Sequence, residues 1–155
     1  MTVLKTLERS LDTRTRDALR PLLCADVSFV VPIRNEAENI GDLIRRIDQA
    51  CAGKADFEII VVNDGSEDNS ADIVRDFATS IPNVRLLNHD RSGGQSAAIH
   101  SGVVHAHGQI ICTLDGDGQN PPSELPKLFM PFLQPDAPRD LGLVAGQRIG
   151  RKDNW

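Results

Sequence analysis

The sequence predicts an α/β fold, a mostly parallel sheet with helices on both faces that follows an N-terminal helix. From residue 27 onward, apolar runs rich in β-branched residues alternate with segments whose apolar residues recur at helical spacing. Strands and helices that alternate in this way form right-handed βαβ units, and the strands of such units lie parallel. The chain of 155 residues is long enough for one domain with a substantial core.

The first predicted element is a helix over residues 3–22, where leucines and an alanine recur at helical spacing among arginines. Pro21 and Asp26 mark its end. We therefore divide the chain into a helical extension, residues 1–25, and one domain, residues 26–155.

The first core strand is expected over residues 27–33, a nearly continuous apolar run of the kind that is buried on both faces of a sheet. A helix follows at Ile40, because apolar residues recur three, four and seven positions later, and Asn39 is its expected N-cap. Further strands are predicted over residues 57–62, 84–87, 110–114 and 141–146, and further helices over residues 71–78, 95–106 and 123–133.

Polar side chains follow the predicted strands at the point where each strand ends. Glu36 follows the first strand, Asp64 the second, Asp115 and Asp117 the fourth, and Arg148 the last. In open parallel sheets, ligands bind at the carboxyl ends of the strands, where the loops converge. We therefore expect one binding site at this edge of the sheet.

Asp115 and Asp117 are the strongest candidates for metal ligands. Two carboxylates separated by one glycine can approach one hard cation, and oxygen ligands suit Mg²⁺ or Mn²⁺. Gln119 has the reach to join them, and residues 114–120 contain no cysteine or histidine that would favour zinc. The alternative is an ordinary Asp-Gly turn with solvated carboxylates.

Other features leave alternatives open. Asp64 could accept hydrogen bonds from a nucleobase or a ribose, or could close the strand–helix connection as an Asx-turn. Glu36 fits either a site role or a favourable charge at a helix start. Gly93 and Gly94 either let the backbone pass close to a ligand or simply make the loop flexible. The G-x-G-x-x-G fingerprint is missing after the first strand, which disfavours an NAD-dependent oxidoreductase.

Composition excludes several function classes. A net charge of -5 and an aromatic share of 4% with no tyrosine argue against a nucleic-acid partner, which needs a cationic surface and stacking platforms. No apolar run is long enough to span a bilayer, and no signal-peptide core opens the chain. The three cysteines form no C-x-x-C pair, so we expect reduced thiols. The expected location is the cytoplasm, or the inner face of the membrane as a peripheral protein.

Four motifs in order resemble one known family. They are residues 31–36 (Val-Pro-Ile-Arg-Asn-Glu), 62–66 (Val-Asn-Asp-Gly-Ser), 93–102, which open with Gly-Gly-Gln, and 115–122 (Asp-Gly-Asp-Gly-Gln-Asn-Pro-Pro). Over about residues 26–150 the chain is similar to the inverting GT-A glycosyltransferases of family 2, in the dolichol-phosphate mannosyltransferase-like branch. The resemblance implies a GT-A, Rossmann-like domain that binds a nucleotide-sugar.

The resemblance also implies roles for the residues of these motifs. Asp115 and Asp117, together with Gln119, would hold Mg²⁺ or Mn²⁺ on the diphosphate and so form the catalytic centre. Asp64 would contact the base, and Arg148 would lie near the phosphates. In full, the residues implied to bind the nucleotide are Pro32, Asn35, Glu36, Asp64, Gln95 and Arg148.

The implied reaction moves a hexose from a UDP- or GDP-sugar to an acceptor, with inversion at the anomeric carbon. The implied acceptor is a polyprenyl phosphate at the membrane surface. A phosphate is largely ionised near neutral pH, so it requires no strong protein base, and the sequence offers no convincing one. Family members continue with an acceptor-binding segment that we expect this chain to lack. The alternative is a nucleotide-binding fragment or a degenerate homologue without turnover, and the base, the sugar and the oligomeric state stay open.

Overall fold

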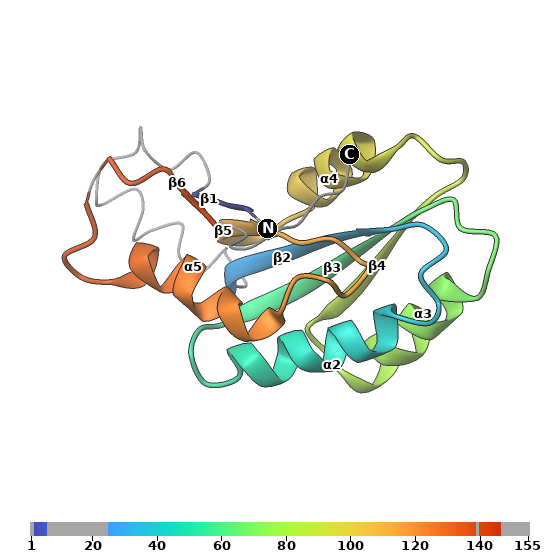
Figure 1. Ribbon diagram of the computed structural model, residues 1–155, viewed down its shortest axis with the longest axis horizontal. Helices are drawn as coiled ribbons and strands as arrows, with labels where there is room; N and C mark the ends of the chain where they lie inside the picture. Colours follow the sequence, from blue (N-terminus) through green and yellow to red (C-terminus); the bar gives the residue numbers. More distant parts are fainter. Residues whose placement is uncertain (1, 6–24, 139, 147–155) are drawn as a thin grey trace, which may run out of the picture.

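A six-stranded sheet forms the centre of the molecule (Figure 1). The computed structural model describes residues 2–5, 25–138 and 140–146. The strand order is β4-β3-β2-β5-β1-β6, in which β4, β3, β2 and β5 are parallel and β1 is antiparallel to both β5 and β6. The strands are β1 (Thr2–Lys5), β2 (Ala25–Ile33), β3 (Phe57–Asp64), β4 (Val84–His89), β5 (Gly108–Thr113) and β6 (Leu143–Ala145). The predicted mostly parallel α/β sheet is therefore confirmed.

Helices cover both faces of the sheet, as predicted (Figure 1). On one face lies α4 (Gln95–Val104), and on the other lie α2 (Ile40–Cys51), α3 (Ser70–Ser80) and α5 (Leu125–Leu133). The short 3-10 helix η3 (Pro122–Glu124) leads directly into α5. In the part of the chain that the structure describes, no helix is both long and apolar enough to cross a membrane.

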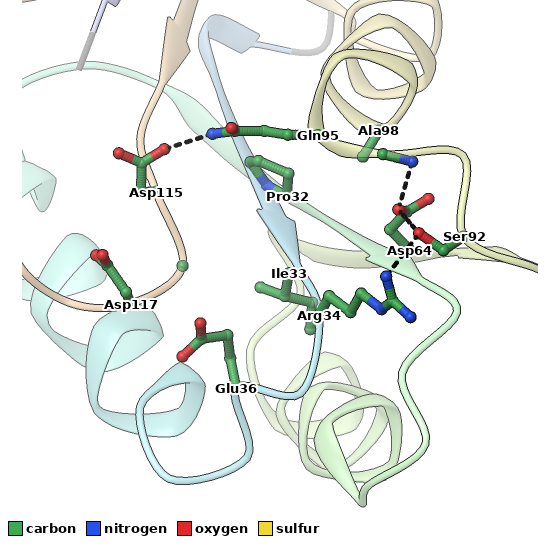
Figure 2. A pocket seen from close by; sticks show the side chains of 12 residues that line it. Pro32, Ile33, Arg34, Glu36, Asp64, Ser92, Gln95, Ala98, Asp115 and Asp117 are labelled. Atoms are coloured by element: carbon green, nitrogen blue, oxygen red, sulfur yellow. Dashed lines mark hydrogen bonds between the residues drawn. The ribbon is translucent and has the colours of Figure 1, made fainter.

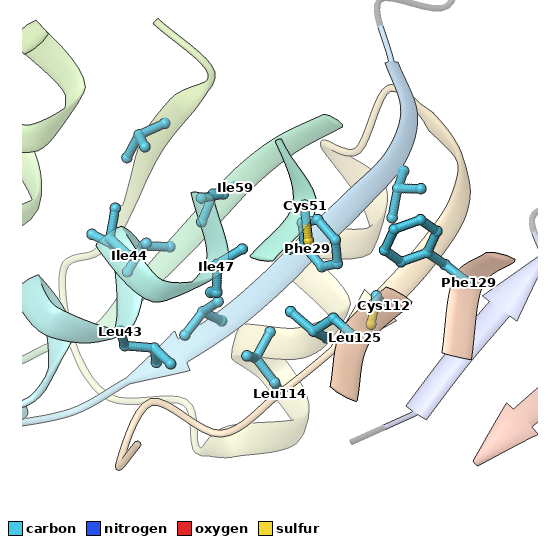
Figure 3. Close-up of a cluster of buried hydrophobic side chains, with 14 of the residues drawn as sticks. Phe29, Leu43, Ile44, Ile47, Cys51, Ile59, Cys112, Leu114, Leu125 and Phe129 are labelled. Atoms are coloured by element: carbon cyan, nitrogen blue, oxygen red, sulfur yellow. The ribbon is translucent and has the colours of Figure 1, made fainter. Parts of the chain in front are cut away.

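The larger core cluster fills the space between the sheet and α2, α3 and α5 (Figure 3). Phe29 is fully buried there and makes edge-to-face contacts with Phe57 and Phe129, with ring centroids 5.7 and 6.0 Å apart. A smaller cluster, which includes Val30 and Ile60, packs beneath α4. Packing on both faces holds the parallel strands, and with them the loops at their carboxyl ends, in fixed positions.

The helix predicted over residues 3–22 is wrong at its start. Thr2–Lys5 form β1, in which Val3 pairs with Cys112 of β5 on one side and with Val144 of β6 on the other. This pairing satisfies backbone groups along the edge of β5, and such a long-range contact overrides a local helical pattern. The start of the extension is therefore a strand of the domain's own sheet. Residues 6–24 lie outside the described residues.

One helix cap and one strand end differ from the prediction in ways that matter for the site. Asn39 precedes α2 as predicted, but its side chain makes no cap bond and instead donates from Nδ2 to Glu36 Oε2 at 2.8 Å. Strand β4 runs on to His89, two residues beyond its predicted end. The longer β4 brings a histidine to the edge of the sheet where the polar residues collect.

Candidate nucleotide and metal site

A pocket of about 470 Å³ opens at the carboxyl ends of β2, β3 and β5 (Figure 2). Its lining comes from the loop after β2, the end of β3, the segment that leads into α4 and the segment after β5. The pocket lies at the edge of the sheet where the sequence predicts a binding site, because parallel strands bring their carboxyl ends together. The polar lining includes Arg34, Glu36, Asp64, Gln95, Asp115 and Asp117.

Gly116 lets the segment after β5 run tightly against β2. A Cβ atom at this position would lie 2.9 Å from the Pro32 carbonyl oxygen and 2.6 Å from Ile33 Cγ2, so a larger residue would push the segment away. The glycine thereby presents Asp115 and Asp117, on either side of it, to the same end of the pocket (Figure 2).

Asp115 and Asp117 are only partly engaged by protein donors. Asp115 Oδ1 accepts a hydrogen bond from Gln95 Nε2 at 2.8 Å, and Asp115 Oδ2 accepts one from Asn120 Nδ2 at 3.3 Å. Asp117 Oδ1 accepts one from the backbone N–H of Gln119 at 3.0 Å. Because a carboxylate offers about four acceptor positions, both aspartates keep room for a cation or another donor.

Asp64 lies at another side of the pocket and is saturated. Its Oδ1 accepts from the Gly93 N–H at 2.8 Å and meets His89 Nδ1 at 2.7 Å, while its Oδ2 accepts from Ser92 Oγ at 2.7 Å and from the Gly94 N–H at 2.8 Å. Burial by itself raises the pKa of the Asp64 carboxyl, but these four hydrogen bonds outweigh it and hold the pKa well below its usual range. Asp64 is therefore an ionised anchor for the loop before α4.

Gly93 and Gly94 bind Asp64, a role that neither interpretation of the sequence predicted. Their backbone N–H groups donate hydrogen bonds to the Asp64 carboxylate, and Gly94 has a φ of 86°, which glycine adopts without strain. Arg34 reaches the same loop, where its Nη1 donates to Ser92 Oγ at 3.3 Å (Figure 2). The loop is thus held from two sides.

The loop after β2 is tied to the loop after β3. Asn35 has a left-handed backbone with a φ of 56°, a conformation that asparagine tolerates better than most residues. Its N–H donates to Ser66 Oγ at 2.9 Å, and its Oδ1 accepts from the Glu67 N–H at 2.8 Å. Of the three residues of this motif predicted to line the pocket, Pro32 and Glu36 do so, whereas Asn35 serves the contact between loops.

Ser70 joins the same two loops. Its hydroxyl accepts the Glu36 N–H at 2.9 Å and donates to Asp68 Oδ1 at 2.5 Å. The bond from Ser70, assisted by backbone N–H groups, outweighs partial burial and lowers the pKa of the Asp68 carboxyl. The Glu36 carboxylate is left to face the pocket (Figure 2).

Charge in the pocket is unbalanced. Among its described lining residues, four carboxylates face one guanidinium, that of Arg34. A diphosphate entering this field would be repelled unless a cation came with it, because like charges at short range disfavour binding.

The donor set fits a cation that binds together with a nucleotide. No cluster of three or more histidine, cysteine, aspartate or glutamate side chains suited to a metal ion occurs within the described ranges. Mg²⁺ is commonly held by one or two carboxylates plus substrate phosphates, and Asp115 and Asp117 offer that number of hard oxygen ligands. Gln119 is exposed and outside the pocket lining, and Arg148 lies outside the described residues, so their predicted roles stay predictions.

Sequence reasoning missed three residues of this site: Arg34, His89 and Ser92. The strand-end rule would have found His89 had β4 been extended to its true end. The same rule covers Arg34, which directly follows the first predicted strand. Ser92 carried no comparable signal, because its contacts depend on how two loops fold toward each other.

Comparison with known proteins decides the family. A family model described as glycosyl transferase family 2 matches residues 28–154, which is most of the chain. The chain belongs to glycosyltransferase family 2. Among the relatives of this family, the undecaprenyl-phosphate 4-deoxy-4-formamido-L-arabinose transferase of Pseudomonas fluorescens (strain SBW25) is 44% identical over 136 residues. That match covers 86% of this chain and 38% of the relative, so the chain spans little more than a third of the relative's length.

Two solved glycosyltransferase structures share the fold. The mannosyltransferase PcManGT from Pyrobaculum calidifontis, in complex with GDP-Man and Mn²⁺, matches with a TM-score of 0.56 and 27% identity over 63% of this chain and 29% of that chain. S. aureus TarS 1–349, in complex with UDP, matches with a TM-score of 0.54 and 25% identity over 59% of this chain and 27% of that chain. The predicted GT-A fold is confirmed by these matches.

Proposed function

We propose that the pocket binds the nucleoside diphosphate of a sugar donor together with Mg²⁺ or Mn²⁺, and that it serves transfer of the sugar, with inversion, to a polyprenyl phosphate. One observation carries the proposal. Asp115 and Asp117 stand with Glu36 at the carboxyl ends of parallel strands, in a pocket whose described lining is strongly anionic. Such a pocket suits an anionic ligand only when a divalent cation accompanies it.

The donor half of the proposal has support from relatives. The P. calidifontis neighbour is described in complex with GDP-Man and Mn²⁺, and the S. aureus neighbour in complex with UDP. Because one neighbour binds a guanine nucleotide and the other a uracil nucleotide, the choice between GDP and UDP stays open for this chain, as it did in the sequence. The hexose expected from the sequence stays a prediction, since the name of the P. fluorescens relative specifies an arabinose derivative.

The acceptor half rests on the name of the P. fluorescens relative, which specifies undecaprenyl phosphate. A lipid phosphate would place the working site at a membrane surface, in keeping with a peripheral protein at its inner face. Its phosphate is already ionised near neutral pH, so the reaction needs no strong protein base.

Transfer with inversion implies an in-line displacement. A phosphate oxygen of the acceptor forms a bond to the anomeric carbon as the bond from that carbon to the diphosphate breaks, and the electron pair stays on the diphosphate. A divalent cation, when bound, stabilises that developing charge. Asp115 and Asp117 would hold the cation. Gln95 restrains Asp115 through its 2.8 Å hydrogen bond, and Gly116 lets the segment that carries both aspartates lie against β2.

Calorimetric titration of UDP and of GDP, each with and without Mn²⁺, tests the donor half. We expect nucleotide and cation to strengthen each other's binding, because neither completes the site alone. Replacing both aspartates, Asp115→Asn with Asp117→Asn, should weaken metal-dependent nucleotide binding by about tenfold or more. The matched control, Asp136→Asn with Asp140→Asn, removes the same charge at exposed positions and should leave binding unchanged.

The donor half would be refuted if the affinity for UDP or GDP did not depend on Mn²⁺, or if it were unchanged by the double substitution of Asp115 and Asp117. Turnover separates a transferase from a binding module. Release of UDP or GDP from a nucleotide-sugar, only in the presence of vesicles that contain a polyprenyl phosphate, would support transfer. Donor binding without such release would favour the alternative of a module that binds nucleotide without turnover.

A further inference from the structure

Asp64 is the centre of a hydrogen-bond network at the carboxyl end of β3. Its two oxygens carry four protein donors at 2.7 to 2.8 Å, and the residue is 4% exposed. These bonds anchor the loop before α4, and the predicted contact of Asp64 with a base stays a prediction.

The loop that Asp64 holds leads to the end of the pocket where Asp115 and Asp117 lie, called here the metal end. Its N–H donors, Gly93 and Gly94, immediately precede α4, and the first residue of α4 is Gln95. Gln95 in turn donates to Asp115 Oδ1 (Figure 2). A shift of the glycine loop would therefore move Gln95 and release one oxygen of Asp115.

His89 lies between the carboxylate that holds this loop and the helix that follows the loop. Its Nδ1 lies 2.7 Å from Asp64 Oδ1, and its Nε2 lies 2.9 Å from Ser101 Oγ, one to two turns into α4. Since Asp64 is acceptor-only when ionised, His89 Nδ1 donates to it. One imidazole thus joins the carboxyl end of β3 to the helix that carries Gln95.

We propose that His89 is a positioning residue of the nucleotide and metal site: by bridging Asp64 to Ser101 it fixes the glycine loop so that Gln95 restrains Asp115. The effect on nucleotide binding rests on the proposed function, whereas the effect on the loop does not. His89 acts through other side chains and is not itself a pocket-lining residue.

The first measurement uses the nucleotide-free chain, in which NMR follows amide exchange at Gly93 and Gly94 and the side-chain amide resonance of Gln95. In His89→Ala we expect exchange at both glycines to accelerate by about tenfold and the Gln95 resonance to shift toward that of a solvated amide. His100→Ala is the matched control, because His100 is an exposed histidine on α4, the helix that carries Gln95 and Ser101. Unchanged exchange and an unchanged Gln95 resonance in His89→Ala would overturn the proposal.

The second measurement is a double-mutant cycle on the affinity for UDP or GDP with Mn²⁺. We expect His89→Ala and Gln95→Ala each to weaken binding by about tenfold, and the double variant to be no weaker than about tenfold, because both changes remove the same restraint. His89→Asn keeps a donor toward Asp64 and should recover most of the affinity. A merely structural role for His89 would instead make the two losses multiply, which would overturn the proposal.

The two measurements separate this inference from the proposed function. If the parent chain binds neither nucleotide while His89→Ala still loosens the glycine loop and Gln95, the proposed function fails and the positioning contact stands. If the parent chain binds and His89→Ala binds equally well, the inference fails alone. Should His89→Ala not fold, Ser101→Ala removes the far end of the bridge and replaces it in both measurements.

Discussion

Replacing Gly116 by alanine should displace both aspartates of the pocket. The added Cβ would lie 2.6 Å from Ile33 Cγ2 and 2.9 Å from the Pro32 carbonyl oxygen, whereas ordinary contacts between carbon atoms lie at about 3.5 to 4.0 Å. Ile33 is 2% exposed, and β2 lies between β3 and β5, so neither neighbour has room to retreat. The segment that carries Asp115 and Asp117 must therefore move by roughly 1 Å.

The shift should reduce both stability and binding. Overpacking of this kind lowers the free energy of unfolding by roughly 1 to 3 kcal/mol. Binding constellations tolerate displacements of only about 0.5 Å, so we expect the affinity for nucleotide with Mn²⁺ to fall by about tenfold or more. Urea unfolding measures the first quantity, and calorimetric titration measures the second.

Gly53→Ala is the control that separates the two effects. Gly53 has a φ of 71° and no atom near its added Cβ, so alanine there is strained by its backbone alone and lies in the loop after α2, away from the pocket. We expect it to lower stability by about 1 to 2 kcal/mol with no change in affinity. If Gly116→Ala bound nucleotide and metal as tightly as the parent chain, the argument from its close contact with β2 would be refuted.

Three further predictions concern the core and the opposite end of the sheet. Burial by itself raises the pKa of Glu58, but hydrogen bonds from Ser28, His107 and Arg85 outweigh it and lower the pKa below 4.5. The stability that this carboxylate contributes should therefore be lost as the pH falls below about 4.5. Glu58→Gln should flatten that dependence in urea unfolding. Burial raises the pKa of Cys51 to about 12 and that of Cys112 further, so in a Cys24→Ser background no thiol should react with a disulfide reagent near pH 8 until the chain unfolds. Gly102→Ala should lower stability by roughly 1 to 3 kcal/mol, because the added Cβ would collide with Val30 and Val62 beneath α4.

Each of these has a matched control. Glu38→Gln, at an exposed glutamate, should keep the pH dependence that Glu58→Gln loses. A thiol that reacts in the folded Cys24→Ser variant would contradict the burial of Cys51 and Cys112. Ser96→Ala changes an exposed position of α4 and should preserve the stability that Gly102→Ala lowers.

The parallel sheet and one end of the pocket could be predicted because they follow from patterns that are local in sequence. Apolar runs mark the strands, and parallel strands must end at one edge, which brings Glu36, Asp115 and Asp117 to one pocket. Strand β1 could not be predicted, because its pairing with β5 joins residues more than a hundred positions apart. No local periodicity records such a contact.

The left-handed backbone conformation of Asn35 could not be predicted from the sequence either. Asparagine permits that conformation without requiring it, and here the bonds from Asn35 to Ser66 and Glu67 select it. Asn35 therefore joins two loops and is not among the residues that line the pocket. A motif position that faces a ligand and one that fixes a loop have the same appearance in sequence.

The sequence also does not distinguish the three aspartates that follow strands, although the structure gives them different surroundings. Asp64 receives four protein donors, Asp115 receives two and Asp117 one. The number of donors decides the task, because a carboxylate with every acceptor position filled has no lone pair for a cation, whereas one that is partly filled is held in place and can still bind. Asp64 therefore anchors the loop that leads to Gln95, and Asp115 and Asp117 remain available to a divalent ion. Since Gln95 joins the two groups, changes at Asp64 or His89 should reach the metal end of the pocket without touching a ligand.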